Sequence, residues 1–91
     1  MRYFRIVGNY NGQPFMLEWN GSVITPLWQE DGKEEWIREV EDEEVFDGEK
    51  EAFVYLRGMS RGLGLPDGGN TCLGECDSKG ELLSDGEWIP S

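Results

Sequence analysis

The sequence predicts a small α+β domain, and three observations support this prediction. The chain has 91 residues, which is enough for one domain with one modest core. Two Asn-Gly pairs, at 11–12 and 20–21, separate segments in which polar and apolar residues alternate, as in consecutive β-hairpins. An acidic segment with helical spacing of its apolar residues follows. We therefore expect an N-terminal antiparallel sheet covered by one helix, in a single domain spanning 1–91.

The first third of the chain predicts a three-stranded antiparallel meander, with strands at about 2–8, 13–19 and 22–28. If each Asn-Gly pair forms a two-residue type I′ turn, both registers follow. Ile6 is then opposite Leu17, Arg5 is opposite Glu18, and Leu17 is opposite Ile24. One face of this sheet is apolar and consists of Phe4, Ile6, Phe15, Leu17, Trp19, Ile24 and Trp28.

A helix over about 32–43 is expected to cover that apolar face. Asp31 with Glu34 three residues later is typical of a helix start, with Asp31 as the N-cap. Trp36, Ile37 and Val40 then fall within about 100° of arc on a helix. The alternative is a strand, in which Trp36 and Val40 share one face and Ile37 the other. The low strand propensity of Glu and Lys favours the helix.

The rest of the chain predicts a turn, a strand and a glycine-rich region. Asp47-Gly48 is a turn signal, and residues 51–57 read as a further strand. Residues 58–91 contain eight of the thirteen glycines, which predicts a loop-dominated tail. Within this tail we expect a short hairpin around 77–80, with Trp88 and Ile89 anchoring the end.

The residue types argue against an enzyme, a cofactor or a bound metal. The chain has no histidine, the commonest general base and metal ligand. Cys72 and Cys76 make only half of a zinc site, and neither Asp67 nor Asp77 begins an EF-hand loop. We expect both thiols to be reduced, with a local disulfide as the alternative. The glycine-rich stretch 57–64 lacks a phosphate-binding motif, so its two arginines are expected to balance the acidic surface.

The charge of the chain points to a basic partner. The net charge is −11 and the isoelectric point is near 4.2, which argues against direct binding of nucleic acid or anionic lipid. Residues 30–51 contain twelve carboxylates and three basic residues, so this quarter of the chain carries −9. As one helix the segment would carry about one net charge per 3.7 Å, close to the spacing of about 3.4 Å per phosphate in one DNA strand. No apolar run predicts a membrane span, so we expect a cytoplasmic protein.

These observations predict a non-enzymatic acidic protein that inhibits a basic, nucleic-acid-binding enzyme or complex by imitating or occluding nucleic acid. The residues expected to contact that partner are acidic, with no catalytic residue among them: Glu34, Glu35, Glu39, Glu41, Asp42, Glu43, Glu44, Asp47 and Glu49. One alternative is a structural or adaptor module that binds through Tyr10, Trp28 or Trp88. Another is a small metal-dependent enzyme built on Cys72, Cys76 and carboxylates.

In size, acidity and lack of catalytic groups, the chain resembles small phage-encoded inhibitors of host defence, such as anti-restriction and anti-CRISPR proteins. The resemblance lies in composition and includes no shared sequence motif. Many such inhibitors are acidic, and some imitate nucleic acid. The resemblance therefore implies a viral protein that acts in the host cytoplasm.

Overall fold

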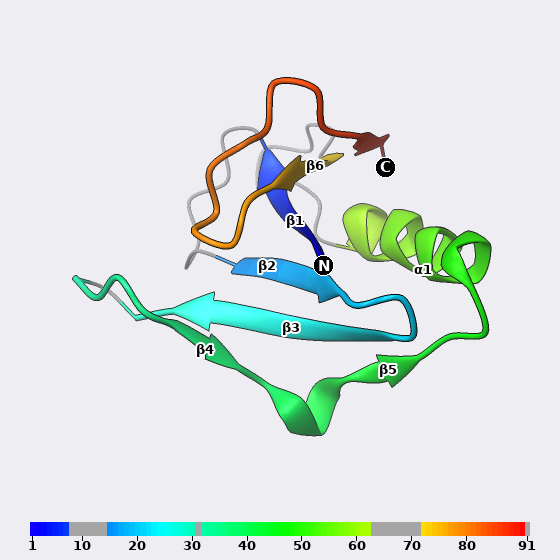
Figure 1. The fold of residues 1–91 in the computed structure, drawn as a ribbon, viewed down its shortest axis with the longest axis horizontal. Helices are drawn as coiled ribbons and strands as arrows, with labels where there is room; N and C mark the ends of the chain where they lie inside the picture. The colour runs from blue at the N-terminus through cyan, green and yellow to red at the C-terminus, as the bar shows by residue number, and fades with distance from the viewer. Residues whose placement is uncertain (8–14, 31, 63–71, 91) are drawn as a thin grey trace.

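In the computed structural model, an antiparallel sheet packs one face against an α-helix (Figure 1). The structure describes residues 1–7, 15–30, 32–62 and 72–90. Its elements in chain order are β1 (Arg2–Val7), β2 (Phe15–Trp19), β3 (Val23–Gln29), β4 (Trp36–Arg38), the short 3-10 helix η1 (Val40–Asp42), β5 (Glu44–Val45), α1 (Glu49–Gly62), β6 (Cys72–Cys76) and β7 (Trp88–Pro90). The predicted α+β class and the three-stranded N-terminal meander are confirmed.

The strand order is β4-β3-β2-β1-β6-β7, and β5 pairs with the same side of β3 as β4 does. In Figure 1, β1 and β6 run steeply across the direction of β2 and β3, which shows how strongly the sheet twists. Residues 72–90 of the predicted loop-dominated tail therefore contribute two strands, and β6 lies inside the sheet between β1 and β7.

The predicted strand register is wrong by two residues at both hairpins. Leu17 pairs with Phe4 rather than with Ile6, and Ile24 pairs with Trp19 rather than with Leu17. A shift of two residues leaves every side chain on its predicted face, because side chains alternate with a period of two. Phe4, Leu17 and Ile24 are accordingly buried together. The first predicted turn, Asn11-Gly12, lies outside the described residues.

The turn between β2 and β3 shows why the register differs. Its two central residues are Gly21 and Ser22, one position later than the Asn-Gly pair suggested. Gly21 has φ of +100°, and a glycine with positive φ at the first central position is typical of a type II′ turn. The side-chain oxygen of Asn20 instead accepts hydrogen bonds from the backbone N–H groups of Ser22 (2.9 Å) and Val23 (2.7 Å). Asn20 therefore supports the turn without occupying its centre.

The predicted helix at 32–43 and the predicted strand at 51–57 are both wrong. Residues 36–38 form β4, and 51–57 lie inside α1. Trp36, Ile37 and Val40 fit a period of either 2 or 3.6, and pairing with β3 favours the strand. In α1, Ala52 and Leu56 are one helical turn apart and fully buried, so this segment follows the helical period. Asp31, the predicted N-cap, lies outside the described residues.

The sheet buries side chains on both faces. On the first face, α1 covers Phe4, Leu17, Trp19, Ile24, Leu73 and Ile89. The Phe4 and Phe53 rings meet edge to face there, with centroids 5.5 Å apart. On the second face, Met16, Leu27 and Cys76 form a smaller cluster, with Tyr3 and Trp36 packed against it. The predicted turn at 77–80 is confirmed, with Gly80 N–H donating to Asp77 O at 3.0 Å.

Candidate acidic binding surface

The nine predicted partner-binding carboxylates lie along one edge of the sheet. Glu34 and Glu35 precede β4, four more residues occupy η1 and its two flanks, Glu44 is in β5, Asp47 follows β5, and Glu49 begins α1. We call these nine residues the acidic edge. Figure 1 shows the β4–η1–β5 segment running along the longest axis of the molecule, outside β3. The Cα atoms extend 34 Å along this axis.

A proline in β3 gives this edge its irregular shape. The Pro26 carbonyl accepts a hydrogen bond of 2.9 Å from Glu39 N–H, so it points toward the edge. In a strand, the N–H and C=O groups of one residue point the same way. Pro26 therefore has no donor to offer the edge segment at this position. β4 and β5 pair with β3 on either side of Pro26, and between them the chain turns outward as η1.

Eight of the nine carboxylates are exposed to solvent. The exception is Glu39, which is half-buried and accepts a hydrogen bond from the Trp28 indole N–H. Glu49 is exposed but forms an ion pair with Arg2. The structure thus brings the predicted site residues to one side of the sheet, as an edge rather than as the helix face that the sequence suggested.

The one basic residue between Glu34 and Glu49 does not neutralise this edge. Arg38 Nη1 donates to Glu18 Oε2 at 2.7 Å, and Nη2 lies 2.6 Å from Oε1. The Glu18 side chain is only 2% exposed, on the second face of the sheet beside Tyr3, its partner in β1. The hydrogen bond to Glu18 raises the pKa of Arg38. Arg38 therefore compensates a buried carboxylate, and its ion pair is not directed at the acidic edge.

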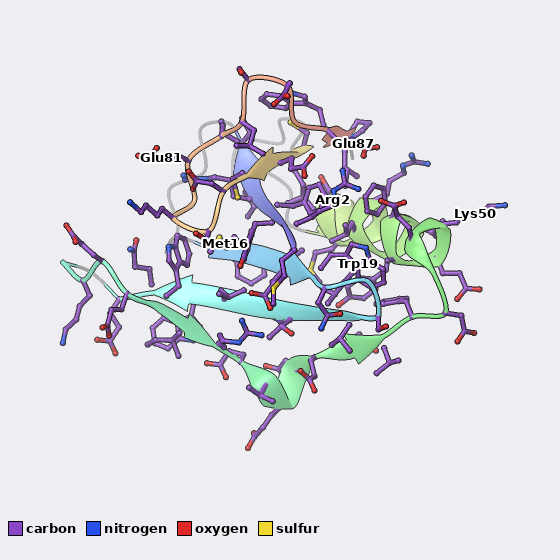
Figure 2. The ribbon with its side chains drawn as sticks, in the orientation of Figure 1. Arg2, Met16, Trp19, Lys50, Glu81 and Glu87 are labelled. Atoms are coloured by element: carbon purple, nitrogen blue, oxygen red, sulfur yellow. The ribbon has the colours of Figure 1, made fainter. Side chains whose placement is uncertain are left out.

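Arg2, which the sequence did not single out, is a second internal counter-charge. It forms ion pairs with Glu49, with Glu75 at 3.0 Å and with Glu87 at 3.0 Å. Its guanidinium carbon also lies 5.0 Å from the centroid of the Phe53 ring. Figure 2 shows Arg2 next to Glu87, whereas Lys50 points into solvent from the start of α1. The sequence indicated this role of Arg2 only through its position, because the alternation of β1 places Arg2 on the same face as Phe4.

The spacing of charge along the edge is comparable to that of a nucleic-acid strand. Nine carboxylates over a length of 34 Å correspond to about one per 4 Å, against about one phosphate per 3.4 Å in a DNA strand. Exposed basic residues flank the set at Lys33 and Lys50. Such an arrangement can bind cationic side chains.

Cys72 and Cys76 do not form the alternative local disulfide. Both are free thiols in β6, where four residues of strand separate their Cα atoms by about 13 Å, and a disulfide requires less than about 7 Å. Burial raises the pKa of Cys76 to about 11. Among the described residues, no three Cys, Asp or Glu side chains are grouped so as to hold a metal ion. None of the described helices is long and apolar enough to span a membrane.

The aromatic residues of the adaptor alternative are distributed differently. Trp88 is 52% exposed in β7, near the exposed Leu82 and Leu83 in sequence. Trp28 is half-buried behind Glu39, and Tyr10 lies outside the described residues. Arg57, one of the two arginines expected to balance the acidic surface, is exposed on α1.

The fold and this surface define an α+β domain with a largely uncompensated acidic sheet edge. In comparisons with known proteins, no protein-family model, curated protein or solved structure matched the chain. The function is therefore inferred from the geometry and charge of the chain itself.

Proposed function

We propose that this chain is a non-enzymatic cytoplasmic inhibitor whose acidic edge occupies a cationic groove of a nucleic-acid-binding protein and thereby excludes nucleic acid from it. The observation that carries this proposal is the disposition of the arginines. Arg38 lies in the edge segment itself yet pairs with Glu18, and among the described ion pairs Arg2 takes only Glu49 from the edge. Of the other eight carboxylates, seven stay exposed, at about one per 5 Å over the 34 Å length, against about one phosphate per 3.4 Å in a DNA strand.

Protection of an exposed sheet edge is a simpler explanation of acidic residues there. Charged side chains, irregularities and short strands all prevent edge-to-edge association. However, Pro26 and η1 already interrupt this edge, and β4 and β5 have only three and two residues. A few charges would complete that protection, whereas this edge carries nine. The excess like charge destabilises the fold by self-repulsion and is accounted for by a basic partner.

The mechanism is electrostatic and steric competition. A concentrated negative field speeds the encounter with a positive groove, and the effect weakens as salt shortens the screening length. Binding releases counterions from both surfaces, as it does when phosphates bind. Affinity should therefore fall steeply between 50 and about 200 mM salt.

The test compares two variants of equal net charge. The edge variant carries Glu41→Gln, Asp42→Asn and Glu43→Gln, which are all exposed around η1. The control carries Glu30→Gln, Glu51→Gln and Asp85→Asn, which are also exposed but lie outside the acidic edge. Binding of fluorescent octa-arginine is followed by anisotropy. Proteins from a heparin-bound fraction of a bacterial extract are then retained on each immobilised chain and challenged with 20-base-pair duplex DNA.

We expect the edge variant to bind octa-arginine at least about fivefold more weakly than the control, with a shallower salt dependence. We also expect duplex DNA to release the proteins that the wild-type chain retains. Equal binding by the two variants, or retention that neither salt nor duplex DNA reverses, would contradict the proposal.

The adaptor alternative rests on the exposed apolar side chains of Leu82 (45%), Leu83 (37%) and Trp88 (52%). An aromatic anchor of this kind often dominates a protein interface. If the chain is an adaptor, Trp88→Ala abolishes retention of the partner while the edge variant leaves it intact. Comparing Trp88→Ala with the edge variant in the same retention assay therefore separates the two functions.

A further inference from the structure

A cleft of about 570 Å³ opens beside the acidic edge. It lies between the ends of β3 and β4 and the turn that follows β6, and its lining residues are Gln29, Glu34, Trp36, Ser78, Lys79 and Glu81. Two segments far apart in sequence thus form its walls. Figure 2 shows Glu81 on the loop after β6, well away from Arg2 and its carboxylates.

The indole of Trp36 is held in place at this cleft. Its N–H donates to the Lys79 carbonyl at 3.3 Å. The ring packs so closely on Gly80 that a Cβ atom there would lie 2.9 Å from Trp36 Cζ2. Trp36 also packs against the buried Met16, Leu27 and Cys76 cluster. A ligand that stacks on this ring would therefore not have to immobilise it first.

The charged groups of the cleft favour a cation. Glu34 comes from the chain before β4 and Glu81 from the loop after β6, and both carboxylates are exposed. Lys79 is the only basic residue among the six that line the cleft, so the lining carries a net charge of −1. An aromatic face flanked by carboxylates is the arrangement that recognises organic cations.

We propose that this cleft binds an arginine side chain, with the guanidinium stacked on Trp36 and paired with Glu34 and Glu81. Arginine fits better than lysine because its planar guanidinium can stack on an indole while it donates to carboxylates in the same plane. The inference rests on the proposed function, since the arginine would belong to the basic partner. Glu34 is the first residue of the acidic edge, so the cleft would add a specific pocket to an otherwise diffuse electrostatic surface.

The cleft is tested by NMR titration of the indole N–H signal of Trp36, assigned with Trp36→Phe, in 150 mM NaCl. The probes are capped Gly-Arg-Gly, Gly-Lys-Gly and Gly-citrulline-Gly peptides, the last being a neutral analogue of arginine. We expect a saturable shift with the arginine peptide, weaker binding of the lysine peptide and no saturation with citrulline. Glu34→Gln and Glu81→Gln should each weaken arginine binding about two- to fivefold.

Lys79→Gln is the most discriminating variant, because it should strengthen binding of the arginine peptide about two- to fivefold. It removes the opposing charge and leaves the backbone carbonyl that holds Trp36. Glu51→Gln and Asp85→Asn are matched controls that change the net charge outside both the lining and the acidic edge, and they should leave the affinity unchanged. Equal binding of the citrulline or lysine peptide would overturn the assignment. So would effects of Glu34→Gln and Glu81→Gln no larger than those of the controls.

The edge variant separates this inference from the proposed function. Its three substitutions lie outside the cleft lining, so the titration with the arginine peptide should be unchanged while binding of octa-arginine is weakened. If the arginine peptide fails to bind but octa-arginine still distinguishes the edge variant from its control, the cleft inference fails alone. If octa-arginine does not distinguish them, the proposed function itself fails.

Discussion

Gly80 is the residue on which the contact between the turn after β6 and Trp36 depends. It has φ of +89° and leaves no room for a side chain against the indole. Asp77 supports the same turn, because its Oδ1 atom accepts hydrogen bonds from the N–H groups of Lys79 (2.8 Å) and Glu81 (3.0 Å). These backbone hydrogen bonds lower the pKa of the Asp77 carboxyl. One turn therefore determines both the position of the indole and one wall of the cleft.

We expect Gly80→Ala to lower the free energy of unfolding by about 1–3 kcal/mol, because it combines an unfavourable φ with a steric clash. Gly21→Ala is the control, since Gly21 has a φ of +100° with nothing within 4 Å of an added Cβ atom. Its cost should be limited to about 1 kcal/mol of backbone strain. Urea unfolding of both variants provides the measurement. Equal losses would show that the contact with Trp36 does not constrain the turn.

A second prediction at the residue scale concerns Arg38. We expect Arg38→Gln to cost about 1–3 kcal/mol of unfolding free energy, because the buried Glu18 carboxylate would lose its counter-charge. This is less than for a fully buried pair, since Arg38 is 46% exposed. The double variant Glu18→Gln/Arg38→Gln should recover part of the loss. Denaturant unfolding of both variants and of Arg57→Gln, an exposed control, tests this, and no recovery in the double variant would contradict it.

At the scale of elements, two roles predicted for one helix belong to two segments. α1 covers the apolar face, and the β4–η1–β5 segment carries most of the acidic residues. The helix covers the apolar face through Ala52, Phe53 and Leu56, and its first turn carries Glu49 and Glu51, which suit the positive end of the helix dipole. The β4–η1–β5 segment pairs with the outer side of β3 and packs Trp36 against the smaller cluster on the second face. Eight of the nine carboxylates of the acidic edge take no part in this packing and stay exposed, which allows the edge to remain highly charged.

Gly58 lowers the stability of α1, because glycine has a low helix propensity. This residue is exposed in α1, and nothing lies within 4 Å of a Cβ atom added there. Gly58→Ala should therefore raise the free energy of unfolding by about 0.5–1 kcal/mol. Thermal unfolding followed by circular dichroism would show this as a higher midpoint. A lower midpoint would mean that the helix is not continuous through this position.

At the scale of the whole molecule, Arg2 joins parts of the chain that are far apart in sequence. Its three carboxylate partners come from the start of α1, from β6 and from the residue before β7. The hydrogen bond with Arg2 holds the pKa of Glu75 below its usual range. The cluster therefore closes the fold between the first strand, the helix and the C-terminal strands.

The pH dependence follows from the sign of this pKa shift. A carboxyl whose pKa is depressed by folding stabilises the protein at pH values above its unfolded pKa of about 4.3, and the contribution is lost as pH falls. We expect Arg2→Met to lower the unfolding free energy at pH 7 by about 1–2 kcal/mol. Between pH 5 and about 3 it should then lose less stability than the wild-type chain. Parallel loss in both proteins, measured by urea unfolding across this range, would contradict the assignment.

Much of the meander and the exposure of the acidic residues could be predicted from the sequence. Phe4, Leu17 and Ile24 were assigned to the buried face from alternation alone, and the error of two residues in register did not alter this, because the side-chain period is two. The nine site residues were identified by charge, and eight are exposed. The conformation of that segment could not be predicted, because Trp36, Ile37 and Val40 fit both periods. The Trp36 cleft could not be predicted either, since its second wall comes from residues 78–81.

The sequence by itself determined the alternation of the first strands, the acidity of the middle segment and the absence of histidine chemistry, since each is a local property of residue type or spacing. Only the tertiary structure decided which segment became the helix and where the arginines point. Those outcomes depend on partners distant in sequence: the outer hydrogen-bonding groups of β3, the apolar face that α1 covers, and the carboxylates that Arg2 and Arg38 reach. The acidic edge remains largely uncompensated for that reason.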